Sequence, residues 1–233
     1  MTQTDGIKDI RKHKRVKDML FGSLERPALK WLCEHSPSWL TPDILTTIGL
    51  LGSALSFLGY LLSNYHPAYL LLSSLGMLVN WYGDSMDGSL ARYRKTERPR
   101  YGFFVDHTLD AVAQLIVFLG FASSPFARFD VAMSTLVVYY LMDILVLART
   151  SVQGEFKITY GKIGPTEVRV LVVIINTILM FWDPALRLSF GEFHLFDVVL
   201  IVIGVSFFGV YISEMLRLTR WLRDLDEGKH IEK

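Results

Sequence analysis

The chain has 233 residues, of which 51% are hydrophobic and 13% aromatic, and its mean hydropathy is +0.33. The apolar residues are gathered into long blocks rather than spread as in a soluble core, which indicates a membrane protein. The formal net charge of +1 argues by itself neither for nor against a nucleic-acid partner, and we expect none. The single cysteine, Cys33, excludes an intrachain disulfide and any multi-cysteine metal site.

Residues 1–42 are predicted to form a cytoplasmic amphipathic arm. Its apolar residues recur at helical spacing: Leu24, Ala28, Leu29, Leu32 and Cys33. This spacing predicts a helix on the membrane surface, and a solvated basic arm is the alternative. Thr41 can cap the helix that follows, and Pro42 can begin it. No cleaved signal peptide is expected, because the first apolar run begins only after this arm.

Six apolar stretches follow, and each approaches the 20 or so residues that cross a hydrocarbon core of about 30 Å. They cover residues 44–63, 68–82, 104–123, 131–147, 168–181 and 195–213. The second and fifth are marginal on their own. We therefore predict an all-α integral membrane protein with six transmembrane helices, preceded by the surface helix. One membrane domain spans residues 43–218, and a polar cytoplasmic tail spans residues 219–233.

The Lys and Arg residues predict the orientation of these helices. They cluster in the N-terminal arm, in the second-to-third and fourth-to-fifth loops, and in the tail, whereas the other loops contain few. The positive-inside rule then places both termini, and any site near the basic loops, on the cytoplasmic side. The membrane would be a bacterial inner membrane or an endomembrane.

Four aspartates lie at the edges of the second and third predicted spans, where an unpaired charge is costly: Asp84, Asp87, Asp106 and Asp110. The first two are three residues apart and the last two are four apart, so each pair occupies one face of a helix. Because the two helices flank one short basic loop, all four carboxylates can come together. Clustered carboxylates need a counter-charge, and oxygen ligands favour Mg²⁺ or Mn²⁺, with room for two ions.

A metal held by carboxylates suggests phosphate chemistry. The ion can grip phosphoryl oxygens, while an unligated carboxylate oxygen accepts a proton from an attacking hydroxyl. Gly88 and Ala91 leave room for a substrate beside the acids, and Arg92 could pair with phosphate. The alternative is that the acids cap helix ends or pair with the basic loop. Four acids in two helical registers favour the metal site.

The segments "DSMDGSLAR" and "GFFVDHTLD" resemble the signature of the CDP-alcohol phosphotransferase family. Every residue of that signature is present: Asp84, Asp87, Gly88, Ala91, Arg92, Gly102, Asp106 and Asp110. One departure is the spacing of nine residues between Arg92 and Gly102, which is one longer than usual. The extra residue falls in the loop and changes neither helical register.

The resemblance implies a six-helix fold, a homodimer, and a reaction in which an alcohol attacks the β-phosphate of a CDP-linked substrate and releases CMP. It makes Asp84, Asp87 and Asp106 metal ligands. Asp110 becomes the general base, with a second role as a metal ligand. The substrate-binding residues would be Gly88, Ala91, Arg92, Gly102, His107 and Arg169. For His107, a role in packing or in hydrogen bonding to the loop is the alternative.

Three further segments resemble the choline and ethanolamine phosphotransferase branch: "LERPALKWLCEHSPSWLTPDILTTIGL", "VDHTLD" and "SVQGEFKITYGKIGPTEVRVLVVIIN". In that branch Glu167 would face the site as a second catalytic residue, although an acid there can simply favour a helix N-terminus. Asp143 lies inside the fourth predicted span, where only a partner or an aqueous cavity makes it tolerable. Arg169 could be that partner.

Three functions remain open from the sequence. The first is transfer of phosphocholine or phosphoethanolamine from its CDP ester to a diacylglycerol-like lipid. The second uses CDP-diacylglycerol as donor and a soluble acceptor such as glycerol phosphate, inositol, inositol phosphate or serine. The third is a cation or proton transporter, which is disfavoured because the four acids sit at the cytoplasmic edge rather than along a path.

Overall fold

Prolines and a capping threonine set where several helices begin. The computed structural model describes residues 21–153, 164–188 and 191–227. Pro42, Pro99 and Pro165 each begin a long helix, where the missing N–H of proline costs nothing. Thr41 caps the first of these, because its hydroxyl accepts the N–H of Ile44 at 3.3 Å. This cap confirms the sequence prediction.

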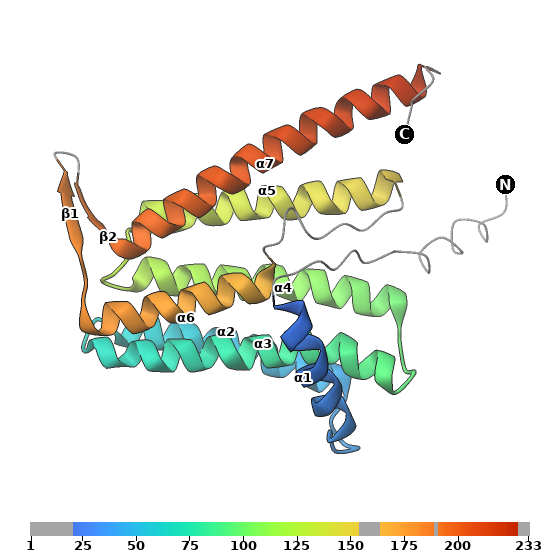
Figure 1. Ribbon diagram of the computed structural model, residues 1–233, viewed down its shortest axis with the longest axis horizontal. Coiled ribbons are helices and arrows are strands. Elements are labelled where there is room, and N and C mark those ends of the chain that lie inside the picture. The colour runs from blue at the N-terminus through green and yellow to red at the C-terminus, as the bar shows by residue number, and fades with distance from the viewer. Residues whose placement is uncertain (1–20, 154–163, 189–190, 228–233) are drawn as a thin grey trace.

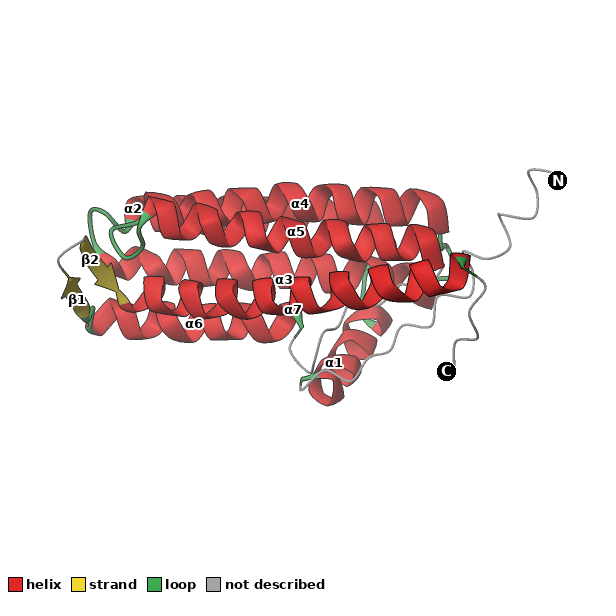
Figure 2. Ribbon diagram, turned by 90° about the horizontal axis from the view of Figure 1, so that it is seen from above, coloured by secondary structure: helices red, strands yellow, loops and turns green. Residues whose placement is uncertain are grey.

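Six long helices form at the six predicted apolar stretches (Figure 1). They are α2 (Pro42–Leu62), α3 (Leu70–Tyr93), α4 (Pro99–Ser123), α5 (Phe129–Gln153), α6 (Pro165–Phe181) and α7 (Leu195–Asp226). A short 3-10 helix, η3 (Pro67–Tyr69), precedes α3. Helices α2 to α6 run side by side along one direction in two perpendicular views, whereas α7 is tilted and diverges from α5 towards its C-terminal end (Figures 1 and 2).

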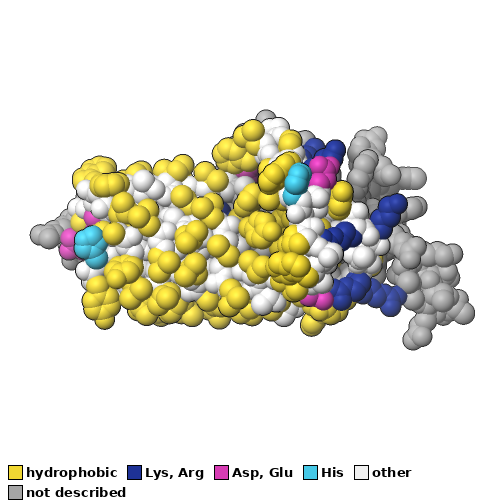
Figure 3. Space-filling view, turned by 90° about the horizontal axis from the view of Figure 1, so that it is seen from below, with side chains coloured by type: hydrophobic (Ala, Val, Ile, Leu, Met, Phe, Trp, Pro, Cys, Tyr) yellow, Lys and Arg dark blue, Asp and Glu magenta, His cyan; other side chains and the backbone are white. Residues whose placement is uncertain are grey.

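Four of the described helices, α2, α4, α5 and α7, are long and apolar enough to cross a membrane. Helix α3 carries Asp84 and Asp87, and α6 has only 17 residues. These are the two stretches that were marginal in the sequence. Both lie within the bundle, since α3 packs along α2 and α6 packs along α3. Hydrophobic side chains cover most of one face of the bundle, and Lys and Arg gather towards one end (Figure 3).

Two elements lie outside the bundle direction. The predicted amphipathic helix is α1 (Gly22–Glu34), which crosses the direction of the long helices and packs on α3 (Figures 1 and 2). Its Cys33 is buried, whereas Trp31 is exposed. At the opposite end, β1 (Ala185–Leu188) and β2 (Gly191–His194) form an antiparallel hairpin that the sequence analysis did not predict.

Small residues bring α2 and α3 unusually close. A methyl group on Gly83 would lie 2.3 Å from the backbone nitrogen of Gly49, and one on Gly52 would lie 2.4 Å from that of Asn80. Both distances are shorter than a methyl carbon can have to another heavy atom. The backbones of α2 and α3 are therefore so close that only the hydrogen atom of a glycine fits between them. This contact fixes the position of Asp84, which follows Gly83 directly.

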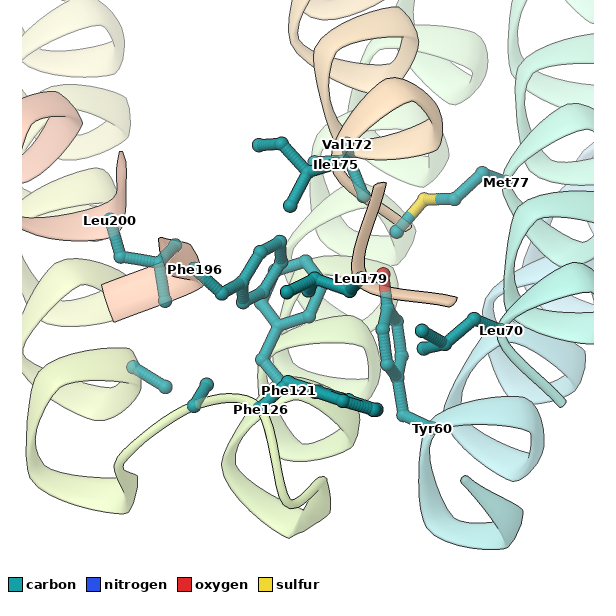
Figure 4. Close-up of a cluster of buried hydrophobic side chains, with 12 residues drawn as sticks. Tyr60, Leu70, Met77, Phe121, Phe126, Val172, Ile175, Leu179, Phe196 and Leu200 are labelled. Carbon is teal, nitrogen blue, oxygen red and sulfur yellow. The ribbon is translucent and has the colours of Figure 1, made fainter. Parts of the chain in front are cut away.

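The main hydrophobic core lies towards the end that carries the hairpin. Its aromatic centre joins the last turns of α2 and α4 to the first turn of α7, through Tyr60, Phe121 and Phe196 (Figure 4). The buried side chains of Ile175 and Leu179 add α6 to the same cluster. The aspartates on α3 and α4 therefore lie at the other end of the bundle, beyond the main core.

Candidate functional site

Three carboxylates from two helices converge in the half of the bundle opposite the hairpin. Asp84 on α3 and Asp106 and Asp110 on α4 each offer an oxygen within 4.8 Å of the others. All three are half-buried. The sequence predicted that these helices would bring their acids together, and the structure does so.

A small pocket contains the fourth aspartate as well. Asp87 lines it together with the other three acids, and the space amounts to about 20 Å³, enough for one water-sized particle. The remaining lining residues come from α2, α3 and α4: Thr46, Gly49, Leu50, Asn80, Leu109 and Ala113. A pocket of this size beside four carboxylates has the dimensions and charge that a divalent cation requires.

The loop between α3 and α4 is tied to neighbouring elements. Arg94 donates to three carbonyl groups between α1 and α2, those of Ser36, Pro37 and Leu40, at 2.5–3.1 Å. Arg98 pairs with Asp43 at the start of α2. The loop between the two helices covers only residues 94–98. The extra residue of the signature spacing falls in this loop, so the acids keep their positions on the faces of α3 and α4.

Asp87 has a specific partner on α2. The Thr46 hydroxyl donates to its Oδ2 at 2.7 Å, and the Gly88 N–H donates to its Oδ1. Thr46 was not among the residues singled out from the sequence. The apolar spacing around it predicted only a helix, and one threonine near a helix start gives no signal of its partner.

Arg169 supplies a positive charge to the acid cluster. Its Nη2 lies 2.6 Å from Oδ2 of Asp84, and both side chains are about four-fifths buried. The sequence proposed that Arg169 binds phosphate or pairs with Asp143. The structure pairs it instead with Asp84, which brings α6 to the site.

Glu167 lies outside the pocket lining. It is buried, and its two oxygens accept the backbone N–H groups of Phe21 at 3.0 Å and Gly164 at 2.9 Å. These contacts cap α6 and hold the residue that precedes α1. The structure therefore does not bring Glu167 together with the four aspartates, and its catalytic role stays a prediction.

Glu25 on α1 is a residue that sequence reasoning missed. One of its oxygens accepts hydrogen bonds from Trp81 and Ser85 of α3 and Thr166 of α6, at 3.0–3.2 Å. Ser85 is the neighbour of Asp84, so α1 is fastened beside the site. No periodicity or motif distinguished Glu25 from a solvated acid on an amphipathic helix.

The other predicted substrate-binding residues lie on the helices that carry the aspartates: Gly88, Ala91 and Arg92 on α3, and Gly102 and His107 on α4. A methyl group on Gly88 would meet the Arg92 guanidinium at 3.2 Å, whereas one on Gly102 would meet nothing within 4 Å. Ala91 is half-buried on the same helix. His107 stacks on Phe103 at 4.2 Å, and its Nδ1 lies 2.8 Å from the carbonyl oxygen of that residue. These positions leave open space at the start of α4.

Comparison with known proteins decides the family. Residues 39–210 match the CDP-alcohol phosphatidyltransferase family. The chain belongs to this family. The match includes α2 to α6 and the first half of α7, and it confirms the resemblance seen in the signature.

Curated relatives fall into more than one substrate class. Cholinephosphotransferase 1 of Gallus gallus is 27% identical over 219 residues, which cover 83% of this chain and 63% of the relative. Archaetidylinositol phosphate synthase of Pyrococcus horikoshii is 27% identical over 139 residues, covering 60% and 70%. The chain thus spans less than two thirds of the chicken protein.

A solved structure shares the fold. The crystal structure of Mycobacterium tuberculosis phosphatidylinositol phosphate synthase with CDP-DAG bound superposes with a TM-score of 0.54. The alignment covers 83% of this chain and 92% of that chain, at 21% sequence identity. At that identity the likeness supports the fold and leaves the substrate open.

Proposed function

We propose that the protein is a metal-dependent CDP-alcohol phosphotransferase of phospholipid synthesis, which transfers a substituted phosphate group to an acceptor alcohol and releases CMP. The observation that carries the proposal is the convergence of Asp84, Asp106 and Asp110 from two helices, with oxygens within 4.8 Å of one another. Family membership supports the same chemistry. It also disfavours a cation or proton transporter.

The residues present fit one or two Mg²⁺ or Mn²⁺ ions. Three carboxylates offer oxygen atoms to one point, Asp87 lines the same space, and hard divalent cations favour such ligands. Bound metal would supply charge stabilisation on the pyrophosphate of the donor. Arg169, held at 2.6 Å from Asp84, adds a fixed positive charge at the same edge.

Asp110 is the proposed general base. It takes the proton of the acceptor hydroxyl as that oxygen bonds to the β-phosphorus, and the bond from this phosphorus to the bridging oxygen breaks as CMP leaves. Gly88, Ala91, Arg92 and Gly102 are proposed to hold the cytidine diphosphate, in the open space at the mouth of the site. His107 on α4 is proposed to join them in binding the substrate.

For the alcohol, we propose phosphocholine or phosphoethanolamine transfer to a diacylglycerol-like lipid. The similarity to cholinephosphotransferase 1 over 83% of the chain supports this choice. Two described ion pairs support it as well, because Arg169 is engaged by Asp84 at the site and Arg149 on α5 is engaged by Glu214 on α7 at 3.3 Å. A phosphorylated acceptor would have to compete with these carboxylates for its cations.

The second candidate is a CDP-diacylglycerol-dependent transferase with a polyol, polyol phosphate or serine as acceptor. The match to archaetidylinositol phosphate synthase, which covers 70% of that relative, favours it. In both candidates we propose that the site and both termini face the cytoplasm and that the protein acts as a homodimer. The positive-inside rule supports this orientation.

One set of assays separates the candidates. The purified protein would be incubated with labelled CDP-choline, CDP-ethanolamine or CDP-diacylglycerol, each with diacylglycerol or a soluble polyol phosphate, and CMP release would be measured. Metal-dependent CMP release with an amino-alcohol donor and a diacylglycerol acceptor supports the first proposal. Release only from CDP-diacylglycerol supports the second, and no release from any donor contradicts both.

A further inference from the structure

A second polar group lies deeper in the bundle than the four aspartates. Asp143 stands on α5, within the candidate span from Phe129 to Val152, and is half-buried. Among the described residues, no cation forms an ion pair with it, and the side chain beside its carboxylate is Gln114 of α4. A carboxylate at that depth without a counter-charge is costly, so it marks a place where a ligand brings one.

Gln114 connects Asp143 to the proposed metal site. Asp106, Asp110 and Gln114 follow one another at intervals of four residues, so Gln114 continues the same face of α4 one turn further from the mouth, about 6 Å along the axis. Its Oε1 is buried and has no hydrogen-bond partner in the described part of the chain. The NH₂ group of Gln114 donates a hydrogen bond to the Asp143 carboxylate, and the unpartnered Oε1 of Gln114 together with the negative charge of Asp143 suits a cation.

Aromatic rings border this pair. Tyr139 precedes Asp143 by one helical turn on the same face of α5, and its ring lies 5.8 Å from that of Phe207 and 6.4 Å from that of Phe118. Tyr139 also lies within electrostatic reach of Asp143, Asp110 and Asp84. The deeper group and the metal-binding acids therefore share one neighbourhood.

We propose that Asp143, Gln114 and Tyr139 form a subsite for the ammonium group of the amino alcohol carried by the CDP donor. A carboxylate beside aromatic rings is the chemistry that recognises quaternary ammonium ions, whereas a hard metal ion needs more than one carboxylate. Four covalent bonds separate phosphorus from nitrogen in such a donor, a length comparable to one helical turn. The inference rests on the proposed amino-alcohol function and assigns its specificity to α4 and α5.

A neutral isostere of choline tests the subsite. The CDP ester of 3,3-dimethylbutanol has the shape of CDP-choline with carbon in place of the charged nitrogen. With diacylglycerol as acceptor, the wild-type protein should prefer CDP-choline in kcat/KM by roughly 10- to 100-fold. Asp143→Asn should lose this preference, mainly through a higher KM for CDP-choline, while CMP affinity and the metal requirement stay unchanged. Asp130→Asn, at the exposed start of the same helix, is the matched control and should keep the preference.

The outcomes are distinguishable. If the wild-type protein turns over CDP-choline and Asp143→Asn retains the preference, the subsite is wrong and the proposed function stands. If the wild-type protein uses neither amino-alcohol donor, both fail. Should Asp143→Asn not fold, Gln114→Leu replaces it, with loss of the preference supporting the subsite and an unchanged preference overturning it.

Discussion

The hydroxyl of Thr46 on α2 donates a 2.7 Å hydrogen bond to Oδ2 of Asp87 on α3. The same hydroxyl lies 3.1 Å from the carbonyl of Pro42, but it has one proton, and the shorter contact is to the charged acceptor. Asp87 is thereby oriented by a helix that carries none of the four aspartates of the site. In the proposed metal site Thr46 would hold Asp87 without contacting the metal, and substitution of such a residue typically costs roughly 10- to 100-fold in metal affinity or activity.

We expect Thr46→Val to lower metal affinity or turnover by roughly 10- to 100-fold, because valine keeps the volume and removes the donor to Asp87. Thr46→Ser should restore most of the loss. Thr47→Val is the matched control, because the exposed Thr47 hydroxyl donates only to the backbone of its own helix. Mg²⁺ titration of the initial rate and Mn²⁺ calorimetry provide the measurement. Equal behaviour of the two valine variants would contradict the role of Thr46.

The second prediction concerns Asp84, which lies in the carboxylate cluster and pairs with Arg169. Asp84→Asn should weaken Mn²⁺ binding and reduce turnover by orders of magnitude, because it removes one charge from the cluster and leaves the guanidinium without its partner. EDTA should abolish wild-type activity reversibly. Asp43→Asn, which breaks an exposed ion pair with Arg98 outside the pocket, should change Mn²⁺ binding little. Full activity of Asp84→Asn at saturating Mg²⁺ would refute the assignment.

Asp110 is expected to act as a base. Asp110→Asn should lower kcat by about 10²- to 10⁴-fold, since amide oxygen cannot take the proton of the acceptor hydroxyl. The variant should still bind the CDP-linked donor, which equilibrium binding of labelled nucleotide would show. A variant that loses nucleotide affinity but keeps its maximal rate would make Asp110 a metal ligand only.

Much of this arrangement was predictable because it depends on local periodicity. The apolar stretches located all six long helices. The spacing of Asp84 with Asp87 and of Asp106 with Asp110 put each pair on one helix face, and the short loop between the two helices brought the pairs together. Two of the six helices, α3 and α6, do not qualify as membrane spans on their own, because one carries charges and the other is short. The positions of α3 and α6 depend on packing against the other helices, which the length of an apolar stretch does not determine.

The partners across helices were not predictable. Thr46 and Glu25 act through residues 41 to 141 positions away, and neither lies in a motif. The hairpin at residues 185–194 was missed because its pattern, with Arg187 opposite Glu192, is short and mixed in polarity. Arg169 was singled out correctly as a residue near the site, but its partner is Asp84 rather than Asp143.

The close contact of α2 and α3 predicts a stability effect. Gly83→Ala should destabilise the protein by about 1–3 kcal/mol, because the new methyl group would lie 2.3 Å from the Gly49 nitrogen and the helices must separate. Gly209→Ala is the control, since nothing lies within 4 Å of its added methyl group. Thermal unfolding in detergent compares the two. Activity should fall with Gly83→Ala as well, because Asp84 moves with the helix.

Glu167 is the residue for which sequence and structure suggest different tasks. Its two carboxylate oxygens accept the N–H groups of Phe21 and Gly164, so it joins the start of α6 to the residue before α1.

In Glu167→Gln an amide NH₂ must face one of these donors. We therefore expect a lower melting temperature, equivalent to about 1–3 kcal/mol for a buried group left without its partner. Glu192→Gln, at an exposed side chain of β2, is the control for loss of an acid. The measurement is thermal unfolding in detergent together with kcat per folded molecule. An unchanged melting temperature would contradict the capping role, and a fall in kcat at full folding would show that Glu167 also acts in the reaction.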